Sequence, residues 1–232
     1  MKYAIPTPPT YTLTIAGSDD LFPVHRVFCV GRNYAAHARE MGKDPDREPP
    51  FFFMKPACAV VAANANPIEI PYPPMTANFH HEIELVVTIN KGGKDIPEAK
   101  ALEHVHGYAV GLDMTRRDLQ LEARDKGRPW EFGKSFAQSA PIGPISMVAE
   151  VGHLSSATIS LTVNDQARQS SDIDKLIWSV AESIAYLSRY ETLMPGDVIM
   201  TGTPEGVNAV VPGDVMRGHI DGLADIVVRV AK

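Results

Sequence analysis

The chain has 232 residues, of which 44% are hydrophobic and 22% charged, and this ordinary globular composition excludes a disordered polypeptide. Its formal net charge of −6 argues against a nucleic-acid-binding protein, because such proteins usually present a basic face. Cys29 and Cys58 are the only cysteines, and no apolar signal-peptide core opens the chain, so we expect reduced thiols and a cytoplasmic protein. No run approaches ~18 apolar residues, so we expect no membrane span.

The first forty residues predict one strand and one helix. Residues 1–20 are proline-rich and show no clear period, so we expect an N-terminal arm or irregular edge segment before a single domain over residues 21–232. Val27 to Val30 then predict a short strand. The chain next turns into a helix, for which Asn33 suits the N-cap and Gly42 suits the position after the C-cap.

Short strands dominate the rest of the pattern. Residues 43–50 are charged and proline-rich and predict a loop, either a lid or a plain surface loop. Asn164-Asp165 and Asp221-Gly222 predict hairpin turns, and apolar residues at helical spacing predict an amphipathic helix over Asp172–Tyr190. Alternation with period two predicts strands at Glu82–Ile89, Tyr108–Asp113, Ile159–Val163 and Val215–Ile220. Many short strands with few helices predict an α+β, mostly β fold, and no GxGxxG or P-loop motif supports nucleotide chemistry.

Three carboxylates fall where neighbouring strands could hold a metal ion. From Glu82 onward every second residue is apolar, so a strand would bury that face and turn Glu82 and Glu84 together to the other. Such a pair alone is more typical of a solvated strand face. Asp113 favours a metal site instead, because it shares a strand face with Ala109 and Gly111, whose small side chains leave room for a ligand.

The donor set indicates which metal would bind. Three hard oxygen donors without a cysteine favour Mg²⁺, Mn²⁺ or Ca²⁺ over zinc. An octahedral ion held by three carboxylates keeps about three positions for a 2-oxo acid and a water. His80 and His81 precede the glutamates and could also be ligands, but we expect them behind the ligands or on the surface.

Six short motifs, in matching order, resemble the fumarylacetoacetate hydrolase family. They are Cys29–His37, Phe53–Pro56, His81–Leu85, Leu112–Asp118, Lys134–Phe136 and Thr201–Val207. Together they cover roughly residues 25–230 and look most like the acylpyruvate hydrolase branch. The resemblance implies a rolled, mixed β-sandwich with few helices, usually a homodimer. It also implies Mg²⁺ or Mn²⁺ on Glu82, Glu84 and Asp113, with Ca²⁺ as a substitute in vitro.

The expected reaction is hydrolysis of a carbon–carbon bond in a small 2,4-dioxo acid, with fumarylpyruvate giving fumarate and pyruvate. In the family the residues matching His37 and Glu40 activate the attacking water, and their spacing puts both on one helical face. Without that context the pair would predict a surface salt bridge. Lys134, beside Phe132 and Phe136, is expected to be partly buried and to donate to the oxyanion at C4; the alternative is a snorkelling side chain.

Further polar residues are expected to bind the substrate. The hydroxyl and backbone N–H of Thr203 would bind the substrate carboxylate, or the hydroxyl would merely cap a turn. Arg32, Arg117 and Gln120 are expected to line the pocket, and Arg117 could equally pair with a metal-binding carboxylate. Arg32 and Arg128 offer guanidinium groups for a second carboxylate, which favours a dicarboxylate substrate.

Other functions stay open on the sequence. The same metal site could decarboxylate oxaloacetate or isomerise a 2-hydroxy-dienoate, although the His37–Glu40 pair favours hydrolysis. A non-catalytic metal-binding β module is the alternative of another class, in which His37, Glu40 and Lys134 would be dispensable. Lys55 is expected to be structural and is placed outside the catalytic set. The expected partners are a small dioxo acid and a second copy of the chain, without nucleic acid or membrane.

Overall fold

The predicted acidic residues lie at the neighbouring ends of two long antiparallel strands. The computed structural model describes residues 3–41 and 48–232. In it, β8 (Ile83–Ile89) pairs with β9 (Val105–Leu112), and Glu84 lies opposite Gly111. Both strands lie where period-two alternation predicted them. Each is one residue shorter at its acidic end, and β9 begins three residues earlier than predicted, at Val105.

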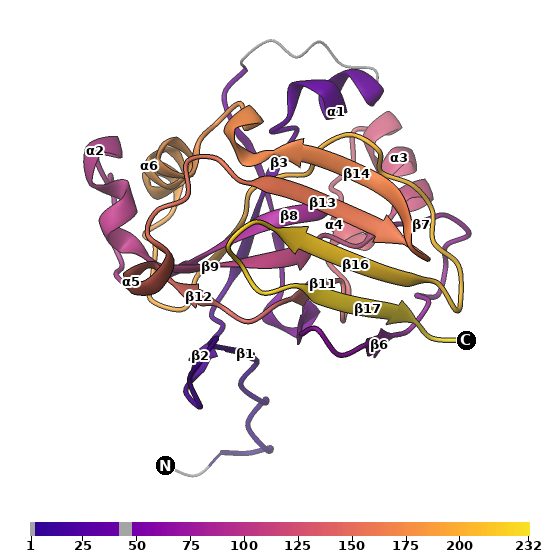
Figure 1. The fold of residues 1–232 in the computed structure, drawn as a ribbon, viewed down its shortest axis with the longest axis horizontal. Coiled ribbons are helices and arrows are strands. Elements are labelled where there is room, and N and C mark those ends of the chain that lie inside the picture. The colour runs from indigo at the N-terminus through magenta and orange to yellow at the C-terminus, as the bar shows by residue number, and fades with distance from the viewer. Residues whose placement is uncertain (1–2, 42–47) are drawn as a thin grey trace.

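These strands occupy the centre of an eight-stranded mixed sheet (Figure 1). Its order is β4-β3-β15-β8-β9-β11-β5, with β12 also paired to β9. The β3–β15 and β5–β11 pairs are parallel and the other pairs are antiparallel. The remaining strands are β3 (Val27–Gly31), β4 (Phe51–Lys55), β5 (Val60–Ala62), β11 (Ala140–Ile142), β12 (Ser146–Met147) and β15 (Val198–Met200). The strand predicted at Val27–Val30 is therefore confirmed.

A five-stranded sheet of order β14-β13-β16-β17-β6 covers one face of the first (Figure 1). Its strands are β6 (Ile68–Ile70), β13 (Thr158–Val163), β14 (Gln166–Asp172), β16 (Val215–Ile220) and β17 (Ile226–Val230). Asn164 and Asp165 form the predicted two-residue hairpin between β13 and β14, with φ angles of 51° and 63°. Positive φ at both positions matches the right-handed twist of the flanking strands. The predicted turn at Asp221-Gly222 follows β16, with Gly222 at φ 83°.

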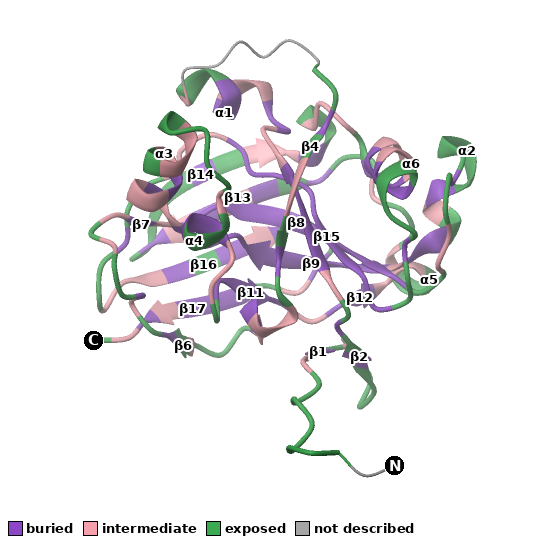
Figure 2. Ribbon diagram, turned by 180° about the vertical axis from the view of Figure 1, so that it is seen from behind, coloured by how far each residue is buried: buried purple, intermediate pink, exposed green. Residues whose placement is uncertain are grey.

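The main core lies between the two sheets. Ile83 and Leu85 of β8 belong to the same buried cluster as Ile159, Met216 and Val228 of the smaller sheet. A second cluster, which includes Val27, Val86 and Leu13, packs on the opposite face of the larger sheet. The central strands are accordingly almost wholly buried, while the exposed residues lie on the loops, the N-terminal segment, outer strands such as β14 and the outer sides of the helices (Figure 2). The predicted fold class, a mostly β rolled sandwich with few helices, is confirmed.

Part of the segment expected to be an irregular arm forms a strand. Thr12–Thr14 forms β1, which pairs antiparallel with β2 (Leu21–Pro23), and Leu13 is fully buried. A second short pair joins β7 (Phe79–His80) to β10 (Thr115–Arg116). Alternation over three residues is too short to separate such a strand from an irregular segment.

The helices are short and lie outside the sheets. They are α1 (Ala35–Glu40), α2 (Glu98–Ala101), α3 (Arg117–Asp125), α4 (Glu131–Lys134), α5 (Val148–Val151) and α6 (Val180–Tyr190), with 3₁₀ turns at Ala57–Ala59, Leu102–His104 and Ile173–Lys175. Among the described residues, no helix is long and apolar enough to cross a membrane. Cys29 and Cys58 are both free, as expected.

The helix predicted over Asp172–Tyr190 is correct only in its second half. α6 begins after Ser179, whose side chain accepts from the Glu182 N–H while Glu182 accepts from the Ser179 N–H. This capping box defines the helix start. Asp172 instead ends β14 and caps the 3₁₀ turn through the Asp174 N–H. The apolar spacing continued through residues that tertiary contacts hold in another conformation.

Candidate metal centre

Three buried carboxylates converge where β8 begins and β9 ends. Glu84 lies in β8, Glu82 precedes that strand and Asp113 follows β9. The strands are antiparallel, so these ends are neighbours, and the Asp113 N–H donates to the Glu82 carbonyl at 2.8 Å. One oxygen from each carboxylate lies within 4.8 Å of the others, and the residues are 5%, 2% and 0% exposed in the order 82, 84, 113. The three predicted ligands therefore form one group.

The reason given for including Asp113 was wrong, although the residue belongs to the group. Gly111 was expected to leave room for a ligand. A Cβ at Gly111 would lie 2.5 Å from Cγ2 of Val86, so that side chain already fills the space. The small residue lets neighbouring strands pack closely and does not form a binding pocket.

Three buried cations contact two of the carboxylates. Lys134 donates to Glu82 Oε2 and to Asp113 Oδ2, both at 2.7 Å. Arg117 pairs with Glu82 Oε1, and Lys55 lies 2.8 Å from Asp113 Oδ1. Buried charges persist only when they are paired, so these contacts hold Glu82 and Asp113 in place. Arg117 thus pairs with a metal-binding carboxylate, and it also lines a small cavity together with Glu82.

Glu82 and Glu84 have opposite electrostatic environments. Burial raises the pKa of Glu82, but Lys134 and Arg117 outweigh it and hold that pKa below its usual range. Burial, with repulsion from Asp113 and Glu82, raises the pKa of Glu84 well above its usual range. Glu84 accepts a hydrogen bond from the Gly202 N–H at 2.8 Å and forms no ion pair with a described residue.

This arrangement fits a divalent cation. A buried carboxylate without a cationic partner is costly, and a metal ion beside Glu84 would supply the missing positive charge. Carboxylate oxygens are the donors that Mg²⁺ and Mn²⁺ prefer. Glu82, Glu84 and Asp113 are thus the residues that would hold the ion.

Lys55 is a site residue that the sequence argument left out. It ends β4, is 1% exposed, and besides Asp113 contacts Ser139 Oγ at 2.9 Å and the carbonyl oxygens of Met114 and Lys134. Lysine is almost never fully buried without a partner. The sequence signal that could have identified this buried cation is a single lysine that follows the aromatic run Phe51–Phe53.

Lys134, the last residue of α4, is buried as expected, but its surroundings differ from the prediction. Phe132 is 82% exposed and points away from any core, whereas the Phe53 ring lies 5.2 Å from Lys134 Nζ. Burial lowers the pKa of Lys134, but Asp113 and Glu82 outweigh it and the pKa is raised. Thr115 Oγ1, at 2.7 Å, accepts the third N–H of this ammonium.

His37 and Glu40 form the predicted pair on α1. His37 Nδ1 lies 3.1 Å from Glu40 Oε2, and His37 is 7% exposed. Glu40 also accepts from the Gly206 N–H at 3.2 Å. The glutamate therefore joins the helix to the turn at residues 201–207, which also carries the donor to Glu84.

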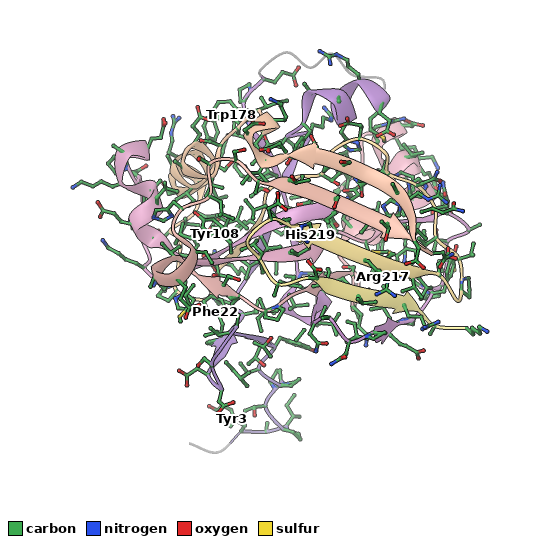
Figure 3. The ribbon with its side chains drawn as sticks, viewed as in Figure 1. Tyr3, Phe22, Tyr108, Trp178, Arg217 and His219 are labelled. Carbon is green, nitrogen blue, oxygen red and sulfur yellow. The ribbon has the colours of Figure 1, made fainter. Side chains whose placement is uncertain are left out.

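Asn33 was predicted as the N-cap of α1, and this was wrong. The N-cap is Tyr34, and no side chain caps it. Asn33 is buried instead: its Nδ2 donates to the carbonyls of Thr201 and Trp178, and its Oδ1 accepts from the Trp178 N–H at 2.7 Å. Trp178, labelled in Figure 3, lies just before α6. Gly42 and residues 43–47 of the predicted lid lie outside the described residues.

A cavity of about 50 Å³ brings half of the predicted site residues together. It is lined by Arg32, His37, Met41, Glu82, Arg117, Gln120, Leu121, Arg124 and Trp130. His37 thus shares one cavity with the metal-site residue Glu82. Gln120 accepts a hydrogen bond from Arg117, which places it beside the ion pair to Glu82.

A larger cavity of about 540 Å³ shares Arg32, Arg124 and Trp130 with the first, and Lys134 also lines it. Arg128 adds a third guanidinium to its wall. Phe51, Phe53 and other aromatic side chains form the apolar part. Arg32 has φ 58°, a left-handed conformation that is uncommon outside glycine. Such a backbone conformation costs conformational free energy, which the surrounding structure must offset. Arg124 was not singled out from the sequence.

Thr203 is 3% exposed and adjoins Gly202, whose N–H holds Glu84. Its hydroxyl accepts from Gln169 Nε2 at 2.8 Å. Gln169 belongs to β14 of the smaller sheet and also contacts His81 Nδ1 at 2.9 Å. His81 is fully buried, which excludes the surface position that the sequence left open for it.

Known proteins resemble the chain over nearly its whole length. A family model described as fumarylacetoacetate (FAA) hydrolase C-terminal matches residues 26–231. The fumarylpyruvate hydrolase of Ralstonia sp is 49% identical over 192 residues, which cover 80% of this chain and 96% of that protein. The crystal structure of fumarylpyruvate hydrolase from Pseudomonas aeruginosa in complex with Mn²⁺ and pyruvate has 61% identity and a TM-score of 0.98, covering 99% of both chains.

More distant relatives carry other activities. The mitochondrial oxaloacetate tautomerase of Homo sapiens is 40% identical over 206 residues, which cover 89% of this chain and 91% of that protein. The fold, the carboxylate group and these similarities agree, and the chain belongs to the fumarylacetoacetate hydrolase family.

Proposed function

We propose that this chain is a Mn²⁺- or Mg²⁺-dependent hydrolase that cleaves the C3–C4 bond of fumarylpyruvate to give fumarate and pyruvate. The observation that carries the proposal is that His37, which pairs with Glu40, lines the same cavity as the metal-site residue Glu82. The similarity to fumarylpyruvate hydrolases of two bacteria supports the same substrate.

The carboxylate group serves the pyruvate end of the substrate. A metal ion held by Glu82, Glu84 and Asp113 would supply Lewis-acid stabilisation of the negative charge that develops there. Thr203 adjoins Gly202, whose N–H donates to Glu84, and Thr203 would bind the C1 carboxylate through its hydroxyl and N–H. Neither group donates to a described residue.

The His37–Glu40 pair would activate the attacking water. Glu40 accepts from His37 Nδ1, which leaves Nε2 as the nitrogen with a free lone pair that would act as the base. As water oxygen bonds to C4, its proton passes to His37 Nε2, the C3–C4 bond breaks, and its electron pair leaves with pyruvate. The imidazolium then returns the proton to C3. Lys134 would stabilise the oxyanion at C4, for which one of its three N–H groups must leave its present acceptor.

The larger cavity supports a dicarboxylate substrate. Arg32, Arg124 and Arg128 line it, whereas Glu131 is its only acidic lining residue among the described ones. Aromatic walls suit the flat, conjugated fumaryl chain. Arg32 forms no ion pair with a described residue, so its guanidinium is available for the distal carboxylate.

Steady-state kinetics with Mn²⁺ test the substrate. Charge-assisted hydrogen bonds contribute about 1.5–3 kcal/mol, so kcat/KM for fumarylpyruvate should exceed that for acetylpyruvate about tenfold to hundredfold. Arg32→Gly removes the guanidinium at a position whose φ suits glycine, and it should abolish this preference while acetylpyruvate turnover persists. Met75→Gly is the matched control, because Met75 is exposed and left-handed with φ 63°.

Other outcomes would support the alternatives. Equal kcat/KM values for the two acylpyruvates would reject the second carboxylate site. Faster turnover of oxaloacetate or of a 2-hydroxy-dienoate would assign the site to decarboxylation or isomerisation. Tight Mn²⁺ binding without turnover of any of these compounds would favour the non-catalytic metal-binding module.

We also propose that the protein is a homodimer, on the strength of the family resemblance. Sedimentation velocity at micromolar concentration should give a species of about twice the chain mass of 25.3 kDa. A concentration-independent monomer would contradict this.

A further inference from the structure

We propose that Gln169 is a positioning residue that holds the Thr203 hydroxyl as a hydrogen-bond donor to the substrate carboxylate. Gln169 comes from β14 of the smaller sheet, yet it is 1% exposed and contacts the loops beside Glu82 and Glu84. The proposal rests on the proposed function, which assigns Thr203 to the carboxylate.

Two backbone groups define the orientation of the Gln169 side-chain amide. The Ile83 N–H can only donate, and it lies 3.1 Å from Gln169 Oε1. The Pro204 carbonyl can only accept, and it lies 2.8 Å from Gln169 Nε2. Exchanging the amide oxygen and nitrogen would break both hydrogen bonds. The usual ambiguity between the two ends of a glutamine amide is therefore resolved here.

That orientation determines the roles of the other two partners. Oε1 must accept from His81, so His81 carries a proton on Nδ1. Nε2 must donate to Thr203, so the Thr203 oxygen is an acceptor in this contact. All four hydrogen-bonding positions of the Gln169 amide are then in use.

The Thr203 hydroxyl keeps one proton, which no described residue accepts. A hydroxyl could otherwise donate to Gln169, but Nε2 carries no lone pair for it. The proton is therefore directed away from Gln169. Thr203 adjoins the residue that holds Glu84, so an anion bound there can accept this proton together with the Thr203 N–H.

Pyruvate binding to the Mn²⁺-loaded protein, measured by calorimetry, tests the proposal without relying on turnover. Thr203→Val keeps the side-chain shape but lacks the hydroxyl, and it should weaken pyruvate binding tenfold to hundredfold. Gln169→Met frees the Thr203 proton to turn toward the Pro204 carbonyl, which has lost its donor, and should weaken binding about tenfold. Gln166→Met, an exposed change on the same strand, is the matched control.

The double variant separates positioning from a structural role. If Gln169 acts through Thr203, the Gln169→Met, Thr203→Val double variant should bind pyruvate no more weakly than Thr203→Val alone. Independent, multiplying losses would overturn the proposal, as would Gln169→Met with a lower Tm and unchanged pyruvate affinity. If Gln169→Met does not fold, Gln169→Glu is the second variant, because a carboxylate oxygen in place of Nε2 can accept the Thr203 proton and should weaken pyruvate binding about tenfold; wild-type affinity would overturn the proposal.

Failure of the proposed function would look different. Wild-type protein that binds pyruvate with this pattern but does not hydrolyse fumarylpyruvate would refute the hydrolase assignment and leave the Gln169 inference standing. Wild-type protein that does not bind pyruvate would overturn the inference.

Discussion

At the scale of single residues, the metal centre is a balance of buried charges in which Glu84 differs from its neighbours. Glu82 and Asp113 contact cations of the chain, whereas Glu84 accepts from the Gly202 N–H and forms no ion pair with a described residue. The chain thus provides cationic partners for two of the three carboxylates. The third carboxylate gains most from an added cation.

The role of His37 can be tested apart from metal binding. His37→Asn should lower kcat for fumarylpyruvate about 10²–10⁴-fold, because the base for the attacking water is lost. Mn²⁺ affinity, measured by calorimetry, should not change, since no predicted ligand is altered. His153→Asn, on an exposed histidine that contacts Tyr108, should leave both quantities unchanged. A wild-type kcat in His37→Asn would refute the assignment.

Lys55 should be essential for stability. Lys55→Met leaves Asp113 Oδ1 without its cation in a fully buried position, a change that costs about 3–5 kcal/mol of the free energy of unfolding. Urea unfolding of the metal-free protein measures this. Lys91→Met breaks an exposed pair with Glu103 and should cost less than about 1 kcal/mol. Similar losses for the two variants would show that the Lys55 contact is not needed.

The sequence indicated the ligands better than the residues behind them. Strand alternation related Glu82 to Glu84, which are two positions apart, and Asp113 joined them through the family resemblance, because the argument from its small neighbours was wrong. Lys55 lies 58 positions before Asp113, and Gln169 lies 88 positions after His81, so no local period connects either residue to the site. Lys55 reaches the site because β4 pairs with β3 in the larger sheet, and Gln169 reaches it because β14 pairs with β13 in the smaller one.

At the scale of elements, patterns of period two were the more reliable guide. β8, β9, β13 and β16 all lie where alternation predicted them, since each packs one face on a core. The helix over residues 172–190 was half wrong because apolar spacing alone does not locate a helix start. The Ser179–Glu182 capping box was visible in the sequence and marked the true one.

The β16–β17 hairpin should have a pH-dependent stability. His219, labelled in Figure 3, contacts Asp225 at 2.6 Å and Asp221 at 2.9 Å, and its pKa is raised chiefly by the hydrogen bond to Asp225. A pKa raised by folding stabilises the native state below the unfolded pKa of about 6.5, and this stabilisation is lost as pH rises through the folded pKa.

Replacing His219 should therefore reduce the free energy of unfolding only at pH values at which its imidazole is protonated in the folded protein. His219→Gln should reduce the free energy of unfolding at pH 6 by less than about 1 kcal/mol, as expected for an exposed pair, and should have no effect at pH 9. Urea unfolding at both values checks this. Asp225→Asn should reproduce the pattern, whereas an equal loss at pH 6 and pH 9 would show that the charge of His219 is not involved.

At the scale of the whole molecule, the metal site couples to global stability. Its ligands lie at the ends of the two central strands, so an ion that binds only the native state stabilises the entire fold. Mn²⁺ at about 100 times its Kd should add about 2.7 kcal/mol, or about 5–10 °C in Tm for a chain of this size. Differential scanning calorimetry with Mn²⁺ and with a chelator measures the shift.

Glu84→Gln is the variant that tests this coupling. It keeps the side-chain shape but removes the carboxylate that lacks a cation, so the Mn²⁺-dependent rise in Tm should disappear. A full rise in that variant would place the ion elsewhere.

The order in which the chain is synthesised has a consequence for this centre. Val27 of β3 pairs with Val198 of β15, and Ile68 of β6 pairs with Val228 of β17. Each pairing closes a loop of more than a hundred residues, and such distant contacts make folding slow. The Gly202 N–H that holds Glu84 is made long after Glu84 itself. A nascent chain therefore lacks the backbone donor to Glu84 until residue 202 has been synthesised, so the complete centre forms only late in the synthesis of the chain.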